Sequence, residues 1–472
     1  MCLAANGIKT YVFDALRPTP ELSFTIRHLN CISGINITAS HNPPAYNGYK
    51  AYWEDGALVT PPHDKGIMDE VAKITDFSLV KTMSKQEAIQ KGLYVLIGEE
   101  LDRAYYDYLK TNLINLDCIK DYAKDANIVY TPLNGAGTAI VPNLLKELGF
   151  ENINIVKEQQ SPDGNFPTLK SPNPESKEAF TLALELAKKV DADLILATDP
   201  DADRLGICVK DNNKNYHFFT GNMTGCLLAE YILSQKQKNA TLPQDGIVIK
   251  TIVTTNLVDE IVSNYNMSLR EVLTGFKWIG KEILDIEQNN SGSFLFGYEE
   301  SYGYSTGMSV RDKDSVVSSM LCCELLAFCK SQNITIWDYM ISIYKKYGYF
   351  IEETSSLSFD GLEGQEKIKG IMDYLRNNPL KEISGYKVTN IRDYKEETIL
   401  DLATNNITKT NLPNSNVLYY DLENNNWLAV RPSGTEPKIK FYFGIKGTSE
   451  EDSAKKANEF KEELAKVINS IV

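Results

Sequence analysis

The alternation of short apolar runs with amphipathic helical patterns is the feature of this sequence that most restricts its fold. From Ala126 onward the chain reads as strand ANIVYTP, helix TAIVPNLLKELGF, strand INIVKEQ, helix ESKEAFTLALELAKKV and strand ADLILAT. Apolar runs of this length, each followed by a helix, are typical of a mostly parallel sheet covered by helices on both faces. The sequence therefore predicts an α/β fold.

Four segments with different patterns predict four domains. Residues 1–118 form an incomplete α/β unit, and residues 119–220 and 221–347 each hold the regular alternation. Residues 348–472 hold runs of strands bracketed by helices, which is typical of a smaller α+β domain. A chain of 472 residues with 43% hydrophobic residues is large enough for several cores.

The composition excludes several classes of partner. The excess of 63 acidic over 49 basic residues gives a net charge of −14, which disfavours nucleic acids and anionic membranes. The sequence contains neither an apolar run of about 20 residues nor a basic and apolar leader at its start, so we expect a cytoplasmic protein. The eight cysteines form no CxxC pair, and we expect reduced core thiols.

The N-terminus begins with an incomplete pattern. Residues 3–7, LAANG, read as the last turn of a helix with Gly7 after its end, but no helix body precedes them. We expect the first domain to lack an earlier strand and helix, as it would in a fragment or after a misplaced start codon.

A strand-end turn at residues 34–50, GINITASHNPPAYNGYK, presents Ser40 and His41 before two prolines, with Lys50 ten residues further on. The segment therefore carries a hydroxyl and a cation on one short, folded-back stretch. A serine that caps its own backbone is the alternative. A serine hydrolase is disfavoured, because no GxSxG surrounds Ser40 and an adjacent serine and histidine are poorly placed for a hydrogen-bonded pair.

The motif DPDADR follows the strand ADLILAT and places Asp199, Asp201 and Asp203 at alternate positions. Carboxylates this close repel one another unless a cation neutralises them, and hard oxygen ligands suit Mg²⁺ or Ca²⁺. An EF-hand is excluded, because Arg204 and Lys210 stand where its glycine and glutamate are required. A solvated acidic turn is the alternative.

Two later turns are candidates for binding a phosphorylated sugar. The turn RPSGTEPK combines Arg431 with small hydroxyl residues and glycine, a mix that can hold a phosphate, although a plain interstrand turn is equally consistent with it. The turn GYEESYG combines Glu299 and Ser301 with aromatic rings, a mix that can bind sugar hydroxyls. An acidic surface turn is the alternative there. Weaker candidates are Thr274, Gly275, Lys277 and Lys313.

Taken together and in this order, TASHNPPAYNGYK, DPDADR, GYEESYGY and RPSGTEPKIK closely resemble the motifs of the α-D-phosphohexomutase family. DPDADR with FGYEES and VRDKDS is most similar to the bacterial phosphoglucomutase/phosphomannomutase branch, which includes phosphopentomutase-like members. The resemblance implies four domains around a central cleft: three related α/β domains and an α+β domain.

The resemblance also implies the roles of the site residues. Ser40 would be a phosphoserine that exchanges its phosphoryl group with a sugar monophosphate through a bisphosphate. One Mg²⁺ per chain would be bound by Ser40 and the three aspartates. Lys50 would be the general acid/base, with a lowered pKa, and His41 and Arg204 would assist the phosphate. Substrate contacts would come from Thr274, Gly275, Lys277, Glu299, Ser301, Lys313, Arg431, Ser433, Gly434 and Thr435.

The implied activity is an isomerase that interconverts α-D-glucose 1-phosphate and glucose 6-phosphate, with glucose 1,6-bisphosphate as intermediate and activator. A phosphomannomutase, a phosphopentomutase, or a truncated phosphosugar-binding protein with little turnover are the alternatives. The partner is a small sugar phosphate, and the sequence leaves monomer and dimer open. The family's substrate-contacting N-terminal loop has no counterpart in residues 1–14.

Overall fold

The structure is a computed structural model that describes residues 1–359, 361–433 and 438–471. The chain divides into two compact units, Met1–Val248 with Gly275–Asp338, and Ile249–Thr274 with Tyr339–Val472. Among the described residues, no helix has both the length and the apolar character needed to cross a membrane.

The first unit contains most of the α/β elements. In chain order they are α1 (Cys2–Ala5), β1 (Thr10–Phe13), α2 (Thr19–His28), β2 (Ser33–Ile37), β3 (Tyr49–Trp53), α3 (His63–Ala72), α4 (Lys85–Gln90), β4 (Tyr94–Ile97), α5 (Glu99–Lys110), α6 (Leu116–Tyr122), β5 (Asn127–Thr131), α7 (Gly137–Glu147), β6 (Asn152–Ile155), α8 (Thr181–Val190), β7 (Leu194–Thr198), β8 (Leu205–Lys210), β9 (Tyr216–Phe218), α9 (Gly221–Lys238), α11 (Phe276–Asn289), β12 (Ser293–Glu299), β13 (Gly303–Ser305) and α12 (Ser315–Ser331).

The second unit contains a helix, a strand and the C-terminal elements. They are α10 (Leu257–Asn264), β11 (Ser268–Val272), β14 (Tyr349–Ser358), α14 (Gly361–Asn377), β15 (Glu382–Ile383), β16 (Tyr386–Asp393), β17 (Thr398–Asp401), β18 (Ile407–Lys409), β19 (Leu418–Leu422), β20 (Trp427–Pro432), β21 (Lys438–Gly447) and α15 (Glu450–Ile471). Two elements, β10 (Gly246–Thr251) and α13 (Ile336–Tyr347), continue across the division between the units.

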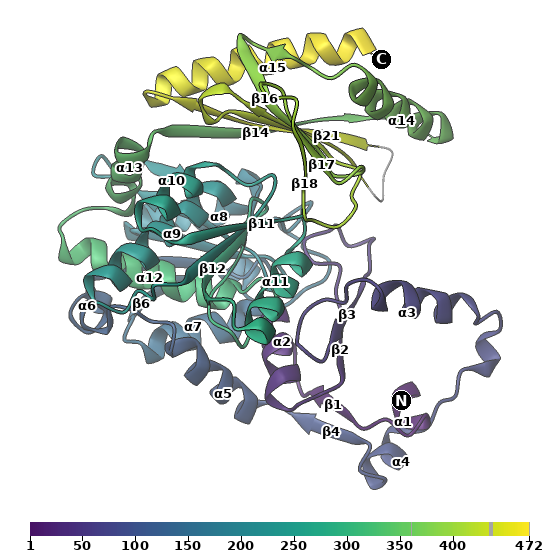
Figure 1. Cartoon of the computed structure of the whole chain (residues 1–472). Helices are drawn as coiled ribbons and strands as arrows, with labels where there is room; N and C mark the ends of the chain where they lie inside the picture. The colour runs from purple at the N-terminus through teal and green to yellow at the C-terminus, as the bar shows by residue number, and fades with distance from the viewer. Residues whose placement is uncertain (360, 434–437, 472) are drawn as a thin grey trace. The chain divides into compact units, whose positions relative to one another are not determined.

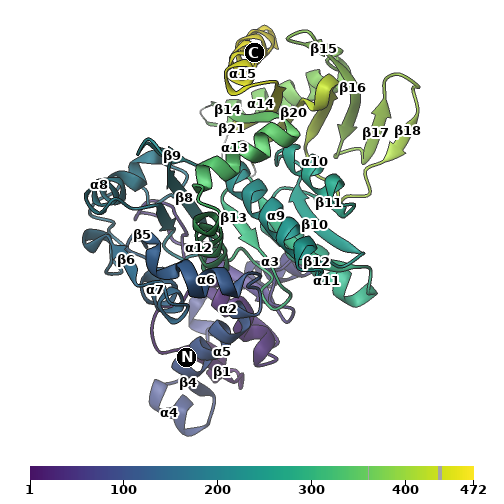
Figure 2. The same cartoon turned by 90° about the vertical axis from the view of Figure 1, so that its left-hand side faces the viewer.

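A five-stranded sheet in the order β6-β5-β7-β8-β9 carries the aspartate motif. Strands β6, β5 and β7 are parallel, as the helix-separated apolar runs predict, whereas β8 and β9 are antiparallel. The connection from β7 to β8 is too short for the crossover that a parallel pair needs, so the chain turns back at the motif. Helix α8 packs against β5 and β7, and α12 contacts β7 and β8 (Figure 2).

The segment that carries Ser40 is an antiparallel hairpin of β2 and β3, in which Asn36 lies opposite Lys50.

The first residues of the chain form a short helix, α1, and Gly7 after it has φ +79°, as the sequence predicted for a helix end. Strand β1 pairs in parallel with β4.

The second unit has a core of its own, in which α15 and α14 pack on an antiparallel sheet in the order β14-β21-β20-β19-β16-β17-β18. Figure 1 shows α15, in yellow, along this sheet. The predicted α+β character of the C-terminal segment is confirmed.

Two local predictions differ from the structure. The sequence pattern from Ser315 to Tyr347 predicts one long helical stretch, but the structure has two helices, α12 and α13, because the chain turns at Asn333, whose φ is +54°. Helix α2 was not predicted at all, because its buried face is largely polar and shows no apolar period.

Candidate active site

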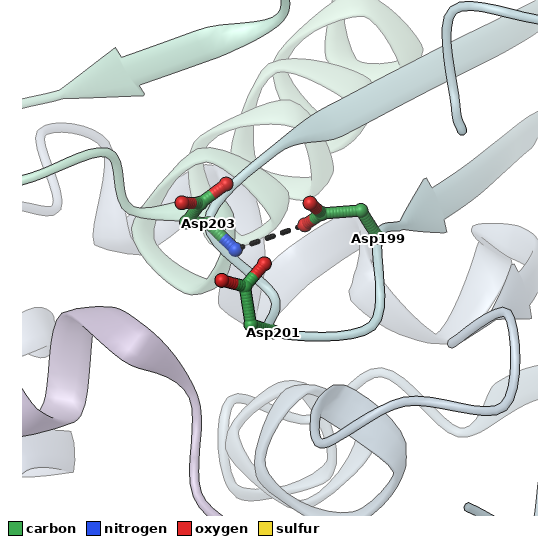
Figure 3. A group of neighbouring side chains, drawn as sticks. All are labelled: Asp199, Asp201 and Asp203. Carbon is green, nitrogen blue, oxygen red and sulfur yellow. Dashed lines mark hydrogen bonds between the residues drawn. The ribbon is translucent and has the colours of Figure 1, made fainter. Parts of the chain in front are cut away.

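The loop between β7 and β8 brings three carboxylates together. Strand β7 is buried along its whole length, and it ends directly before Asp199. A set of ligand oxygens, one each from Asp199, Asp201 and Asp203, lies within 4.8 Å of one another, and all three residues are buried. Figure 3 shows the three carboxylates gathered around the turn of the loop. The sequence placed these residues on one loop, and the structure brings their side chains together.

Hydrogen bonds between side chains and the main chain fix the shape of this loop. Asp199 Oδ1 accepts hydrogen bonds from the backbone N–H groups of Asp203 at 3.1 Å and Arg204 at 3.0 Å. Ala202 has φ +52°, an uncommon conformation for a residue with a side chain. The Ser315 hydroxyl, at the first residue of α12, donates to the Ala202 carbonyl. The loop is therefore held by its own carboxylate and by a neighbouring helix.

The hairpin brings Ser40 and Lys50 to the same loop. The Ser40 hydroxyl donates to Asp199 Oδ2 at 2.8 Å, and Lys50 Nζ donates to Asp201 Oδ2 at 2.7 Å and to Asp203 Oδ2 at 3.0 Å. Residues separated by about 150 positions in the chain are thus in direct contact.

Ser40 itself has φ +51°, and its N–H donates to Thr38 Oγ1. In this conformation Ser40 Oγ lies 3.2 Å from Nδ1 of His41. The expectation that the adjacent serine and histidine are poorly placed for a hydrogen bond is therefore wrong. The Ser40 hydroxyl nevertheless donates to Asp199, so the contact is not the serine-to-histidine donation of a hydrolase triad.

A second lysine reaches the loop from the segment before α12. Lys313 Nζ lies 3.1 Å from Asp203 Oδ2. Its stem passes over Gly303, where a Cβ would come within 2.3 Å of Lys313 Cδ and 3.1 Å of Glu299 Oε1. Glycine at this position therefore allows the predicted sugar-binding Glu299 and Lys313 to lie together.

The pKa values of Asp199 and Asp203 shift in opposite directions. Burial raises the pKa of Asp199 well above its usual range, and the nearby carboxylates of Asp201 and Asp203 raise it further. Burial would also raise the pKa of Asp203, but the charges of Lys313, Lys50 and Arg204 outweigh burial and lower it. The cluster thus combines the Asp199 carboxyl, which resists ionisation, with the Asp203 carboxyl, which ionises readily.

The pKa values of Lys50 and His41 shift in opposite directions. Burial alone would lower the pKa of Lys50, but the carboxylates of Asp203 and Asp201 raise it well above the usual lysine value. The pKa of Lys50 was expected to be lowered, as suits an acid/base lysine. The two carboxylates raise it instead. Burial and the Arg204 charge lower the pKa of His41 to about 4, so this imidazole is neutral at pH 7.

The aspartate loop fits a divalent cation. Asp201 Oδ1 and Asp203 Oδ1 are buried, and within the part of the chain that the structure describes no hydrogen-bond donor reaches either of them. Buried carboxylate oxygens without a partner carry a large desolvation cost, which a hard cation would offset. The donor set is therefore suited to a hard divalent cation.

Of the remaining predicted residues, Arg204 belongs to the aspartate loop itself and the others lie on other segments. Lys277 Nζ lies 3.9 Å from Asp64 and over the ring of Trp278. Gly275 has φ +113° before α11. Arg204 pairs with Glu175 at 2.7 Å. Thr274, Arg431 and Ser433 belong to the second unit, Ser301 lies between β12 and β13, and Gly434 and Thr435 lie outside the described residues.

The sequence did not identify Thr19, which contacts the loop, or Asn36, which contacts Thr19. The Thr19 hydroxyl donates a hydrogen bond to Asp201 Oδ2, and Asn36 Nδ2 donates one to the Thr19 hydroxyl. The run Arg17-Pro-Thr19-Pro-Glu21 carries a helix-start signal, proline in the first turn with an acidic residue after it, and this signal could have located α2.

Comparisons with known proteins match most of the chain to one family. Family models described as "Phosphoglucomutase/phosphomannomutase, alpha/beta/alpha domain" I, II and III match residues 1–77, 103–213 and 220–347, and the corresponding "C-terminal domain" model matches residues 380–467. A phosphoglucomutase from Staphylococcus haemolyticus is 37% identical over 444 residues, which is 94% of this chain and 78% of that protein.

Solved structures show the same fold. The phosphoprotein pp63/parafusin (phosphoglucomutase) of Paramecium is 18% identical with a TM-score of 0.72, and the match covers 98% of this chain and 82% of that one. A putative phosphomannomutase from Thermus thermophilus is 21% identical with a TM-score of 0.69, and the match covers 99% of this chain and 85% of that one.

Proposed function

The chain belongs to the phosphoglucomutase/phosphomannomutase family, and we propose that it interconverts α-D-glucose 1-phosphate and glucose 6-phosphate through a phosphoserine at Ser40. The observation that carries this proposal is the direct contact of the Ser40 hydroxyl with Asp199, at the edge of a buried aspartate cluster that also holds two lysines.

The proposed reaction transfers two phosphoryl groups. Phosphoserine 40 passes its phosphoryl group to O6 of glucose 1-phosphate, so the Oγ–P bond breaks, an O6–P bond forms, and glucose 1,6-bisphosphate results. The bisphosphate then turns around, and the phosphoryl group on O1 returns to Ser40 Oγ. In each half-reaction the attacked hydroxyl loses one proton and the departing oxygen gains one.

The residues of the first unit suit this transfer. Lys50 lies on the strand after the Ser40 turn, and we assign to it the proton exchanged at the transferring phosphate. Lys313, Arg204 and neutral His41 would donate hydrogen bonds to phosphate oxygens. Ser40, Asp199, Asp201 and Asp203 would hold one Mg²⁺, which when bound neutralises charge on the phosphoryl group.

The remaining substrate contacts stay predictions. Glu299 and Ser301 would bind the sugar hydroxyls. The phosphate that is not being transferred would be bound by Arg431, Ser433, Gly434 and Thr435, with Thr274, Gly275 and Lys277 as further contacts. The division into four domains with the boundaries given above is likewise a prediction.

A coupled assay for glucose 6-phosphate, with Mg²⁺ and with or without glucose 1,6-bisphosphate, tests the proposal. We expect turnover that the bisphosphate stimulates. Ser40→Ala should abolish turnover, because it removes the oxygen that carries the phosphoryl group between the two sugar positions. A rate that survives this substitution would reject the phosphoserine mechanism.

Substrate choice and turnover need separate measurements. A panel of glucose, mannose and pentose 1-phosphates distinguishes the mutase types. Intact-mass measurement distinguishes a mutase from a protein that only binds phosphosugars. We expect a phosphorylated protein whose added mass disappears on exposure to sugar phosphate, whereas an unphosphorylated and unreactive Ser40 would indicate binding alone.

A further inference from the structure

The two oxygens of Asp201 have different surroundings. Oδ2 accepts hydrogen bonds from Lys50 Nζ at 2.7 Å and from the Thr19 hydroxyl at 3.2 Å. Oδ1 is buried, and among the described residues no donor reaches it. A carboxylate held through one oxygen in this way presents the other to a ligand. The residues that hold Oδ2 therefore determine where Oδ1 points.

Thr19 contacts Asp201 through both its main chain and its side chain. It is the first residue of α2 and is fully buried. Its N–H, one of the donors that a helix start leaves without an intrahelical acceptor, donates to the Asp201 carbonyl at 2.8 Å. Its hydroxyl donates to Asp201 Oδ2. One residue of α2 thus fixes the backbone and the carboxylate of the same aspartate.

Asn36 sets the direction of the Thr19 hydroxyl. Asn36 lies opposite Lys50 in the β2–β3 hairpin, and its Nδ2 donates to Thr19 Oγ1 at 2.7 Å. A hydroxyl has one proton, so a hydroxyl that accepts this bond keeps its proton free to donate to Asp201. The two opposed hairpin residues therefore both act on Oδ2, Lys50 directly and Asn36 through Thr19.

We propose that Thr19, supported by Asn36, is a positioning residue that orients Asp201 Oδ1 towards the divalent cation. This inference rests on the metal site proposed above. It also gives a reason for a buried polar residue at the start of α2, where Thr19 donates a hydrogen bond to the aspartate loop.

Three substitutions in the full chain test the role of the hydroxyl. Thr19→Val removes the hydroxyl at nearly constant volume, and Thr19→Ser keeps it. Thr25→Val is the matched control, because Thr25 is buried on the same helix and its hydroxyl has no hydrogen-bond partner among the described residues. Circular dichroism and thermal melting check that each variant folds.

Binding of Mn²⁺ alone, followed by electron paramagnetic resonance, is the primary measurement. We expect Thr19→Val to weaken Mn²⁺ binding roughly tenfold, the lower end of the range for residues that orient a metal ligand. Thr19→Ser and Thr25→Val should bind as the wild type does. In the mutase assay, Thr19→Val should need more Mg²⁺ for half-maximal rate and recover most of the wild-type kcat at saturating Mg²⁺.

A folded Thr19→Val protein that binds Mn²⁺ as tightly as the wild type would overturn the inference. The inference would also be overturned if Thr19→Ser and Thr19→Val both weakened Mn²⁺ binding by the same factor, because the hydroxyl would then have no effect. A wild type that binds no Mn²⁺ would instead contradict the metal site of the proposed function. The two failures are therefore distinguishable.

A double-mutant cycle tests the order of the contacts. Asn36→Ala should weaken Mn²⁺ binding in the wild-type background and cause no further loss in Thr19→Val, because Asn36 acts through the hydroxyl that this variant lacks. Equal losses in both backgrounds would show that Asn36 does not act through Thr19, and would overturn that part of the inference.

Discussion

Glu21 shows how a single buried residue can make stability depend on pH. Its side chain is fully buried on α2, and among the residues described no hydrogen-bond donor reaches either carboxylate oxygen. Burial raises the pKa of Glu21 to about 9, and Asp102 contributes after it, through a hydrogen bond with the protonated carboxyl and through its negative charge. Glu21 is therefore protonated in the folded protein at neutral pH, whereas in the unfolded chain it would ionise near pH 4.3, roughly the value for an unperturbed glutamate.

This difference predicts the sign of the pH effect. The raised pKa favours folding fully below the unfolded value of about 4.3, and the benefit is lost as the pH rises towards 9, at about 1.4 kcal/mol per unit. Glu21→Gln removes the titration at nearly the same size. We expect the variant and the wild type to have similar unfolding free energies at pH 5, and the variant to be more stable by about 2–4 kcal/mol at pH 8.

Urea unfolding at several pH values measures this difference. Glu100→Gln, which makes the same substitution at an exposed position of α5, is the matched control. If the unfolding free energies of Glu21→Gln and the wild type differed by the same amount at every pH from 5 to 8, the buried carboxyl would not titrate as described.

Among the elements, the hairpin and the helix after it differ sharply in packing. The hairpin turn is held at Asp199 through Ser40, whereas α3 has no buried residue. The apolar side chains of Met68 and Val71 on α3 are 64% and 53% exposed. In contrast, α12 is buried over most of its length. Local opening should therefore be easy in α3 and difficult in α12.

Hydrogen–deuterium exchange measured by mass spectrometry checks this expectation. Peptides from α3 should exchange within seconds to minutes, and peptides from α12 should remain protected for hours. Protection of α3 comparable to that of α12 would mean that its apolar side chains are covered in solution.

Elements with an apolar period could be predicted from the sequence, and elements with polar buried faces could not. The strands β5, β6 and β7 and the helices between them follow the predicted alternation. Helix α2 buries Thr19, Glu21 and Ser23, so its pattern resembles a loop. These side chains are buried because of contacts with distant segments, such as the hydrogen bond that the Ser23 hydroxyl donates to the Gly56 carbonyl, which no local pattern reveals.

The same distinction holds for the site. The aspartates could be identified because one short motif carries all three, and Ser40 and Lys50 because one hairpin carries both. Thr19 and Asn36 could not, since each is an ordinary polar residue: Thr19 matters through its hydrogen bond to Asp201, and Asn36 through its hydrogen bond to Thr19. The pKa of Lys50 was expected in the wrong direction, because its value depends on two carboxylates about 150 residues away.

At the scale of the whole molecule, the two compact units should respond differently to metal. The second unit has a core shared by its sheet, α14 and α15, and the first unit has cores of its own. Among the described residues, the group of side chains suited to a cation is Asp199, Asp201 and Asp203, and it lies in the first unit. A cation that binds only the folded first unit should stabilise that unit alone.

Differential scanning calorimetry in EDTA and in excess Mg²⁺ can separate the two responses. We expect two transitions. Mg²⁺ at about 100 times its dissociation constant adds about 2.7 kcal/mol to the stability of the first unit, which raises its melting temperature by a few degrees. The transition of the second unit should not move, and Asp203→Asn should reduce the Mg²⁺-dependent shift. If Mg²⁺ raised the melting temperatures of both transitions equally, or if there were a single transition that Mg²⁺ raised, the two units would unfold together.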